Sequence, residues 1–340
     1  MANQRFQNSL QKVPQNVPPI WFMRQAGRYH KHYQAIRARH DFDQLCRQPQ
    51  LACDVTMGPI EDFDFDVAIL FSDLLYPLDA IGLELSYGDK GPQLAKRLTT
   101  DFVKTLPKPE IAVQELLFQK EAMQLIRKTL PAEKSLIGFV GGPWTLFVYG
   151  VENGHSGNLV ECKSSFDMYR KFAETMVPLL KLNIDLQLKG GAEVVMIFDT
   201  AAGELSPVHY QTYVEPHLLE LNRNFAGKLG YYSKGTQGSF FSDKMKKAPW
   251  AGMGFDHRWN LPAVFREDYP GFIQGNFDQA LLSAPPELFA EDLEKYLSFF
   301  LKLSPAERKG WVCALGHGCL PSSREENVRH FVKRVREVFK

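Results

Sequence analysis

Cysteine is scarce in this sequence, and the patterns that would give its few thiols a role are missing. The chain has five cysteines among 340 residues, with no Cys-x-x-Cys pair and no Asn-x-Ser/Thr glycosylation acceptor. An odd number of unpatterned cysteines is typical of a reduced protein whose thiols are small buried apolar groups. We therefore expect a cytoplasmic location and no disulfide framework.

Long apolar runs and an excess of one charge are also absent. No run in the sequence approaches the roughly 20 apolar residues that a membrane-spanning helix needs, so no membrane partner is expected. The chain has 40 Lys and Arg against 39 Asp and Glu, a formal net charge of +1. Nucleic-acid-binding proteins usually carry a clear excess of Lys and Arg. This balance therefore argues against a nucleic-acid partner.

Acidic residues are missing altogether from residues 1–40, which contain seven Lys and Arg and three His. If residues 24–39 form a helix, Arg24, Arg28 and His32 are spaced by four and share one face. Arginine suits two-point recognition of carboxylate or phosphate groups. This basic N-terminal segment is interpreted either as a clamp for a small polyanionic ligand or as a solvated basic face.

Short apolar runs alternate with longer amphipathic stretches, and no repeat or linker divides the chain. Continuous apolar runs suit a parallel sheet that is covered on both faces. About eight strand–helix units predict an α/β fold of the (β/α)₈ TIM-barrel type, as a single domain over residues 1–340. We expect strands at 19–23, 67–71, 136–140, 193–198, 229–233, 251–255, 271–274 and 311–315, and helices at 110–129, 165–189, 207–228, 287–303 and 325–339.

The positions that follow the predicted strands are polar or rich in glycine. A TIM barrel places its active site at this end of its strands. Because loops are polar in most proteins, the pattern alone leaves a functional and a structural interpretation open. In chain order the strand-end residues are Arg24, Asp73, Gly141–Pro143, Asp199–Thr200, Lys234, Asp256, Asn276 and His317.

Asp73 ends the apolar run VAILFSD, and two interpretations remain open for it. A carboxylate at the tip of a buried strand is costly unless a donor or a cation lies nearby. It either stabilises a cationic intermediate and accepts N–H bonds from a substrate, or it caps the next helix.

His317 lies between two glycines, which is consistent with a closely approached imidazole that donates to a carboxylate or carries a proton. With Cys319 it also forms a His-x-Cys pair. A catalytic zinc site needs about three protein ligands, and no third ligand is evident in the sequence, so no metal is expected.

The segment GFVGGPWTLFVYGVENG at residues 138–154 combines a predicted strand, a Gly-Gly-Pro turn and several aromatic residues. Glycines there allow close approach of the backbone, and Tyr149 could present its hydroxyl to a ligand. The segment lacks the Gly-Lys-Ser/Thr ending of a phosphate-binding loop, and no dinucleotide-type GxGxxG follows a strand. No cofactor site is predicted.

Six motifs closely resemble those of the uroporphyrinogen decarboxylase family, in the order of that family and over nearly the whole chain. The resemblance implies a homodimeric barrel enzyme without metal or organic cofactor. It implies a carboxy-lyase of heme biosynthesis, which removes CO₂ from the four acetate side chains of uroporphyrinogen III and yields coproporphyrinogen III. The motifs are PPIWFMRQAGRY (18–29), FSDLL (71–75), IGFVGGPWTLFVYGVE (137–152), IFDTAAGELSP (197–207), QGNFD (274–278) and LGHG (315–318).

Carried across by motif, the resemblance implies that Arg24, Asp73, Tyr149 and His317 are catalytic. Asp73 would lie beneath the macrocycle, accept pyrrole N–H bonds and stabilise positive charge. The substrate carries eight carboxylates, which gives the basic N-terminal segment a purpose. The implied substrate-binding residues are Arg24, Gln25, Arg28, Arg37, Phe71, Asp73, Tyr149, Thr200 and His317.

The chain departs from its relatives at four places, and two functions other than decarboxylation remain open. Relatives often read RYLPEYR, FAKDGH, GLDWT and GNLDP where this chain has RYHKHYQ, YSKGTQG, GFDHR and GNFDQ. One alternative is a zinc-dependent corrinoid or thiol methyltransferase on the related barrel, in which a His-x-Cys pair is expected near the fifth strand, where this chain reads YYSKGTQG. The other is a non-catalytic binder of tetrapyrroles or nucleic acid.

Overall fold

The apolar runs form one parallel sheet in the computed structural model, which describes residues 2–88, 91–155, 157–267 and 269–340. Neighbouring strands of this sheet follow the order of the chain. Every residue in these strands is buried, as expected for a sheet covered on both faces. The strands are β1 (Val67–Ile69), β4 (Ser135–Gly141), β5 (Val194–Asp199), β6 (Leu229–Ser233), β7 (Gly252–Gly254), β8 (Phe272–Phe277) and β9 (Trp311–Leu315).

The two edge strands of the sheet, β1 and β9, are joined through Pro19 and Ile20. Cys313 of β9 donates its backbone N–H to the carbonyl of Pro19 at 2.9 Å. Asp66, directly before β1, donates its backbone N–H to the carbonyl of Ile20 at 2.9 Å. The curled sheet is thereby closed into a TIM-like barrel, which confirms the predicted fold class.

The expected strand at residues 19–23 is reduced to a single parallel bridge between Ile20 and Cys313. Pro19 has no N–H and cannot extend the ladder. The N–H of Ile20 is taken by a side chain instead, because it donates to Oδ2 of Asp66 at 2.8 Å. The segment at Pro19 and Ile20 therefore occupies the place of the first barrel strand but is too short to form a ladder.

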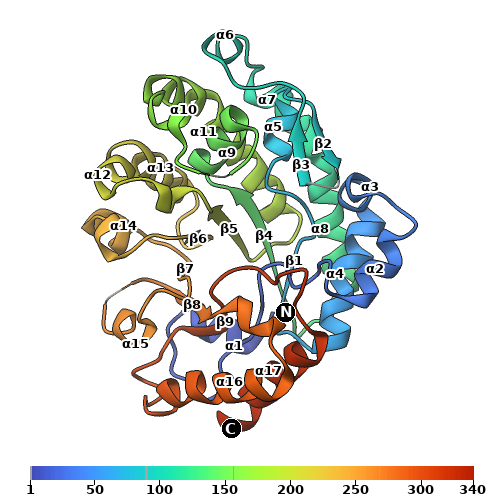
Figure 1. Ribbon diagram of the computed structural model, residues 1–340, viewed down its shortest axis with the longest axis vertical. Coiled ribbons are helices and arrows are strands. Elements are labelled where there is room, and N and C mark those ends of the chain that lie inside the picture. Colours follow the sequence, from blue (N-terminus) through green and yellow to red (C-terminus); the bar gives the residue numbers. More distant parts are fainter. Residues whose placement is uncertain (1, 89–90, 156, 268) are drawn as a thin grey trace.

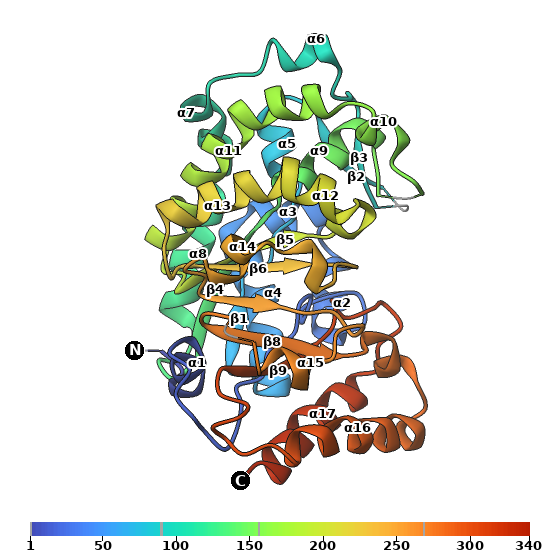
Figure 2. The ribbon, with the colours of Figure 1, turned by 90° about the vertical axis from the view of Figure 1, so that its left-hand side faces the viewer.

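Helices cover the outside of the barrel (Figures 1 and 2). Their buried residues recur every three or four positions, as Phe289, Leu293 and Leu297 do in α16, so that one face packs on the sheet. The longer helices are α4 (Pro49–Phe63), α8 (Leu117–Thr129), α9 (Pro143–Glu152), α11 (Phe166–Lys189), α13 (Glu215–Asn224), α16 (Pro286–Leu301) and α17 (Glu325–Val338). The shorter ones are α1 (Gln4–Leu10), α2 (Lys31–Arg37), α3 (Phe42–Arg47), α5 (Tyr76–Ala80), α6 (Thr100–Val103), α7 (Pro109–Ala112), α10 (Val160–Lys163), α12 (Pro207–His209), α14 (Asp243–Lys247) and α15 (Leu261–Val264).

Two of the predicted helices are interrupted. The stretch 110–129 begins in α7, passes through a 3₁₀ turn at Val113–Leu116 and continues as α8. The stretch 207–228 contains a π turn at Tyr210–Val214 between α12 and α13. The apolar spacing continues through both interruptions, so it indicated helix without showing where the hydrogen-bond pattern changes.

Sequence analysis missed helix α4 and an antiparallel hairpin of β2 (Leu85–Gly88) and β3 (Gly91–Leu94). Pro59 lies inside α4, where proline normally interrupts a helix. The hairpin strands are mostly half-buried or exposed, so they lack the apolar run that marked the barrel strands.

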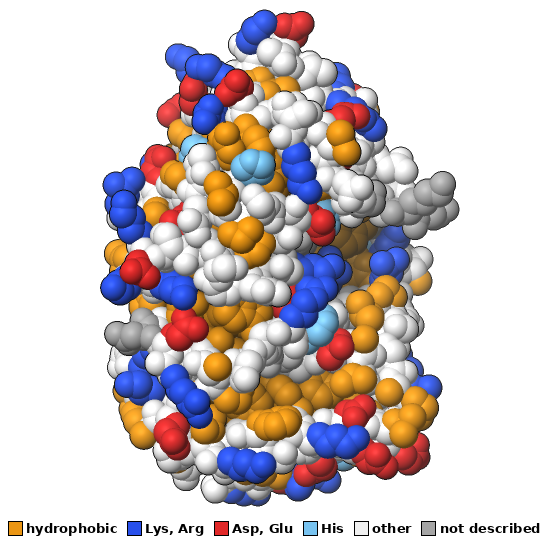
Figure 3. All heavy atoms as spheres, turned by 60° about the vertical axis from the view of Figure 1, so that its left-hand side comes forward, with side chains coloured by type: hydrophobic (Ala, Val, Ile, Leu, Met, Phe, Trp, Pro, Cys, Tyr) orange, Lys and Arg blue, Asp and Glu red, His pale blue; other side chains and the backbone are white. Residues whose placement is uncertain are grey.

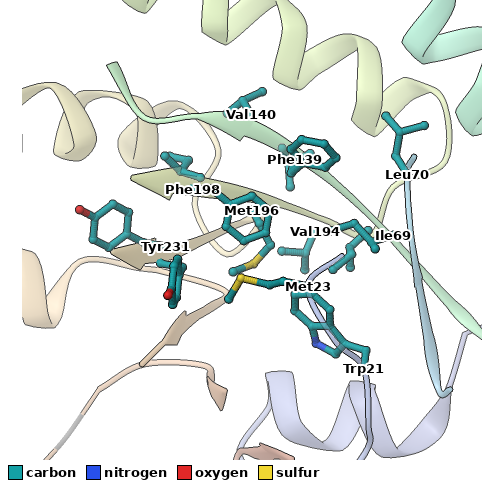
Figure 4. Packing of buried hydrophobic residues seen from close by; sticks show 14 of the residues in the cluster. Trp21, Met23, Ile69, Leu70, Phe139, Val140, Val194, Met196, Phe198 and Tyr231 are labelled. Atoms are coloured by element: carbon teal, nitrogen blue, oxygen red, sulfur yellow. The ribbon is translucent and has the colours of Figure 1, made fainter. Parts of the chain in front are cut away.

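Apolar side chains fill the interior of the barrel. Figure 4 shows Met23, Phe139 and Met196 among the side chains that point into it. Glycine provides space in the strands, because a Cβ at Gly230 would lie 2.2 Å from Sδ of Met196. A packed interior leaves the carboxyl ends of the strands as the place for a ligand.

The cysteines are small buried groups, as expected from the sequence. All five cysteines are buried and unpaired. None of the helices formed by the described residues is both long and apolar enough to cross a bilayer.

Candidate active site

Arg24 lies at the mouth of the barrel, in the turn that follows the bridge at Ile20. Its φ angle of 55° is in the left-handed region, and the turn is fastened because the N–H of Cys319 donates to the carbonyl of Met23 at 3.0 Å. The Arg24 side chain runs across Gly318, where a Cβ would lie only 2.7 Å from Cδ of Arg24. Glycine at 318 therefore makes room for an arginine that remains exposed.

Asp73 stands four residues beyond β1, close enough to Arg24 for the two charges to interact. Its Oδ1 accepts the N–H of Leu75 at 2.8 Å, and no described residue donates to Oδ2. Burial raises the pKa of Asp73, while the Leu75 hydrogen bond and the charge of Arg24 oppose that rise. Asp73 does not cap α5, whose N-cap position is Leu75; it stabilises the preceding turn and keeps one carboxylate oxygen available.

Tyr149 and Thr200 follow β4 and β5, the two strands that come after β1 in the circle of strands. Tyr149 lies on α9, and burial and the nearby Asp73 raise the pKa of its hydroxyl, so it is neutral and able to donate. α9 lies directly over the strand ends because Gly142 has no side chain; a Cβ there would be 2.7 Å from Cγ of Asp199. Thr200 follows Asp199 at the end of β5 and is half-buried.

Arg28 and Arg37 both lie close enough to Tyr33 for their charges to act on it, and both remain exposed. Their charges oppose the rise in the pKa of Tyr33 that burial causes, and Arg37 also hydrogen-bonds to the Tyr33 side chain. The Tyr33 ring packs against Phe71, with centroids 5.7 Å apart. Phe71 thus connects the two arginines to the strand end that carries Asp73.

A shared face for Arg24, Arg28 and His32 required one helix over residues 24–39, and that condition is not met. Only Lys31–Arg37 is helical, because turns occupy the preceding residues, including one in which the N–H of His30 donates to the carbonyl of Gly27 at 2.9 Å. Arg24 and Arg28 therefore share the mouth of the barrel through a folded loop, not through a helix face.

His317 follows β9 and stacks on Tyr232, with ring centroids 5.8 Å apart and an angle of 16° between the planes. The Tyr232 hydroxyl donates to the carbonyl of Gly316 at 2.8 Å and lies 3.0 Å from Nδ1 of His317. Its single proton is used by the carbonyl, so its oxygen accepts from Nδ1–H, which leaves Nε2 without a proton.

Burial and then the positive charge of Arg24 lower the pKa of His317 to about 3. The imidazole is therefore neutral and presents an acceptor at Nε2 in the free protein, whereas sequence analysis expected a donor or a proton carrier. Lys234, His257 and Arg258 lower the same pKa further, which indicates that positive charge surrounds this ring.

The geometry brings Arg24, Asp73, Tyr149 and His317 to one end of the barrel. The model of the family described as "Uroporphyrinogen decarboxylase (URO-D)" matches residues 1–338. The chain belongs to this family. It is 35% identical to the uroporphyrinogen decarboxylase of Solibacter usitatus over 98% of this chain and 97% of that protein. It is 34% identical to that of Pseudoalteromonas atlantica, over 98% and 96%.

Solved structures support the fold independently. A methyltransferase from Methanosarcina mazei superposes with a TM-score of 0.79 at 16% identity, covering 99% of both chains. A putative vitamin-B12 independent methionine synthase from Listeria monocytogenes superposes with a TM-score of 0.57 at 10% identity, covering 96% of this chain and 97% of the other. At these identities the likeness shows the barrel architecture that this family member shares with them.

Three basic or polar residues of the N-terminal segment lie away from the mouth in this URO-D family chain. Gln25 is buried, and its Nε2 donates to the carbonyl of Val67 at 3.2 Å, so it fastens the segment to β1. Arg5 donates to Asp66 at 3.3 Å, and Lys12 donates to the carbonyl of Tyr269. Because Asp66 and Tyr269 precede β1 and β8, these two charges lie at the opposite end of the barrel from Arg24.

Sequence analysis missed Tyr232 and the contacts of Asp256. Tyr232 lies within a strand of apolar and aromatic residues, so the sequence does not distinguish it from a core residue. Only the direction of its side chain, toward the inside of the barrel, indicates a role in the site. Asp256 was noted as a strand-end residue, but its role was not predicted. It is 1% exposed, and its carboxylate accepts the N–H of Gly235 at 2.8 Å and the N–H of Arg258 at 2.9 Å. It joins the loops that follow β6 and β7.

Proposed function

We propose that this member of the URO-D family is a uroporphyrinogen decarboxylase, a carboxy-lyase that converts uroporphyrinogen III into coproporphyrinogen III. The observation that supports this most strongly is the position of Asp73. Its carboxylate lies at the barrel mouth, keeps Oδ2 free of donors among the described residues, and interacts with the charge of Arg24. A half-buried anion beside cationic groups is suited to a ligand that itself becomes positively charged while carrying many carboxylates.

In the proposed reaction, a carbon of one pyrrole ring is protonated and the ring becomes a cation. The bond between the acetate methylene and its carboxylate then breaks, its electron pair moves into the ring system, and CO₂ leaves. The methylene carbon takes up a proton to become a methyl group, and loss of the first proton restores the ring. The substrate ring is its own electron sink, a role that other decarboxylases assign to an organic cofactor.

Each site residue has a defined task in this proposal. Asp73 accepts pyrrole N–H bonds through Oδ2 and stabilises the ring cation. Arg24, Arg28 and Arg37 bind substrate carboxylates, because charged two-point hydrogen bonds suit these groups. Tyr149 donates from its neutral hydroxyl. His317 accepts through Nε2 and is not the acid, because its pKa is about 3.

The zinc-dependent methyltransferase alternative makes different demands on the chain. Residues 233–238, SKGTQG, contain neither His nor Cys at the place where that branch is expected to carry its pair. The thiol of Cys319 is buried, and burial raises its pKa to about 12, whereas a zinc ligand must be a thiolate. Stoichiometric zinc in purified protein, lost in Cys319→Ala, would favour the methyltransferase over the decarboxylase.

The test of the proposal is anaerobic incubation of the purified protein with uroporphyrinogen III, followed by separation of the products by number of carboxylates. We expect species with seven, six and five carboxylates and then coproporphyrinogen III with four, together with CO₂ release. Unchanged substrate after prolonged incubation with folded protein would contradict the proposal. Light scattering on the same preparation tests the homodimer that the resemblance implies.

A further inference from the structure

Two cations stand across the barrel from the arginines already described. Counted around the barrel from the segment at Pro19 and Ile20, the strands run β1, β4, β5, β6, β7, β8 and β9. In a circle of eight positions, β6 therefore faces the segment that carries Arg24, and β7 faces β1. Lys234 directly follows β6, and Arg258 lies four residues beyond β7.

Arg258 is held in place by a buried carboxylate. Its Nη1 donates to Oδ2 of Asp256 at 2.7 Å, and its backbone N–H donates to Oδ1 of the same residue at 2.9 Å. Oδ2 of Asp256 also accepts the N–H of Gly235. The Arg258 side chain is 49% exposed, and its Nε and Nη2 have no acceptor among the described residues. One edge of the guanidinium is thus anchored and the other faces solvent.

Both cations adjoin the candidate active site. The loop after β7 packs directly on the loop after β9, because a Cβ at Gly316 would lie 2.4 Å from the backbone nitrogen of His257. The charges of Lys234 and Arg258 both reach His317, whose pKa they lower. Lys234 has no ion-pair partner among the described residues and is half-buried. Figure 3 shows Lys and Arg side chains around a recess with hydrophobic side chains at its bottom.

We propose that Lys234 and Arg258 form a second carboxylate-binding wall, which holds acidic side chains on the half of the substrate that points away from Arg24, Arg28 and Arg37. This inference rests on the proposed function, because it needs a flat ligand with carboxylates on every side. Moving a carboxylate out of water is costly unless a cation or donors receive it. A macrocycle that fills the mouth places half of its carboxylates beyond the reach of the first group of arginines, and Lys234 and Arg258 lie on that side.

Steady-state kinetics with uroporphyrinogen III test the wall in the variants Lys234→Gln and Arg258→Gln. Loss of one charged hydrogen bond to a carboxylate corresponds to roughly a tenfold rise in KM, and kcat is expected to stay within about twofold because neither group touches the reacting ring. KM should also become less sensitive to salt in both variants. Arg266→Gln is the matched control: it removes the same charge from an exposed position in the segment before β8, at the other end of the barrel.

The two proposals fail in different ways. If the wild-type protein releases no CO₂, the proposed function is wrong. If the wild-type protein is active and both variants keep its KM and its salt dependence, the wall is wrong. Arg258→Gln leaves Asp256 without a positive partner and can reduce stability, so its thermal midpoint is measured alongside. Lys234→Gln breaks no ion pair among the described residues, and its KM decides the question even if Arg258→Gln does not fold.

Discussion

We expect the imidazole of His317 to stay neutral in the free protein from pH 8 to pH 5. Burial and the charge of Arg24 lower its pKa from the ordinary value of 6.5 to about 3. This difference corresponds to about 5 kcal/mol of preference for the neutral form. At pH 6 only about one molecule in a thousand would carry the proton, so His317 should act as an acceptor and not as an acid.

Nuclear magnetic resonance of protein with ¹⁵N-labelled histidine measures this directly, with the His317 signals assigned from a His317→Asn variant. We expect the His317 nitrogen shifts to remain constant from pH 8 to pH 5 and to show a protonated Nδ1 and an unprotonated Nε2. Arg24→Gln should raise the pKa of His317, because Arg24 is the largest charge acting on it. Arg266→Gln, which removes a distant charge, should leave it unchanged.

A His317 that titrates near pH 6.5 in the wild-type protein would refute this reasoning. So would a protonated Nε2 at pH 8, because the Tyr232 hydroxyl would then have to donate to Nδ1 and not to the carbonyl of Gly316. Either result would return His317 to the set of candidate proton donors and would require a different acceptor for the substrate.

Three further outcomes follow from the same geometry. Asp73→Asn should lower kcat for CO₂ release by about 10²-fold or more, because the ring cation loses its counter-charge; activity close to wild type would show that Asp73 is not the stabilising anion. Arg28→Gln should raise KM for uroporphyrinogen III roughly tenfold with kcat nearly unchanged, and a KM equal to wild type would remove Arg28 from the clamp. Burial raises the pKa of Asp199 from 3.8 to about 6. The contribution of Asp199 to the free energy of unfolding is therefore fully present below about pH 4 and is lost as the pH rises through 6. Asp199→Asn should remove this contribution, so the variant should gain about 3 kcal/mol in free energy of unfolding relative to the wild type between pH 4 and pH 8. Urea denaturation of both proteins at the two pH values measures this, and a difference between them that does not change with pH would contradict it.

The barrel could be predicted from the sequence because its strands are buried on both faces. Runs such as residues 136–140 and 193–198 contain little except apolar residues, and each lies within a strand or one residue from its observed start. The run at 19–23 has the same composition, yet it forms only one bridge, since Pro19 lacks an N–H and Ile20 bonds to a side chain. Composition shows burial, whereas the hydrogen-bond ladder depends on partners that are distant in sequence.

The sequence could predict those residues of the candidate site that follow strands. Asp73 and His317 follow strands in both the sequence and the structure, and the fold brings them near Arg24. The helix considered for residues 24–39 does not form as one piece, because the chain turns at its start, where Arg24 has a positive φ. The role of Arg258 was not visible in the sequence, because it depends on how the loop after β7 meets Asp256 and the loop after β9.

The most direct test of the central claim is a crystal structure of the protein with coproporphyrinogen III bound under anaerobic conditions. We expect the macrocycle at the carboxyl ends of the strands, with Oδ2 of Asp73 about 2.7–3.2 Å from pyrrole nitrogens and its carboxylates paired with arginines. A product that binds elsewhere, or one whose pyrrole nitrogens face away from Asp73, would contradict the account.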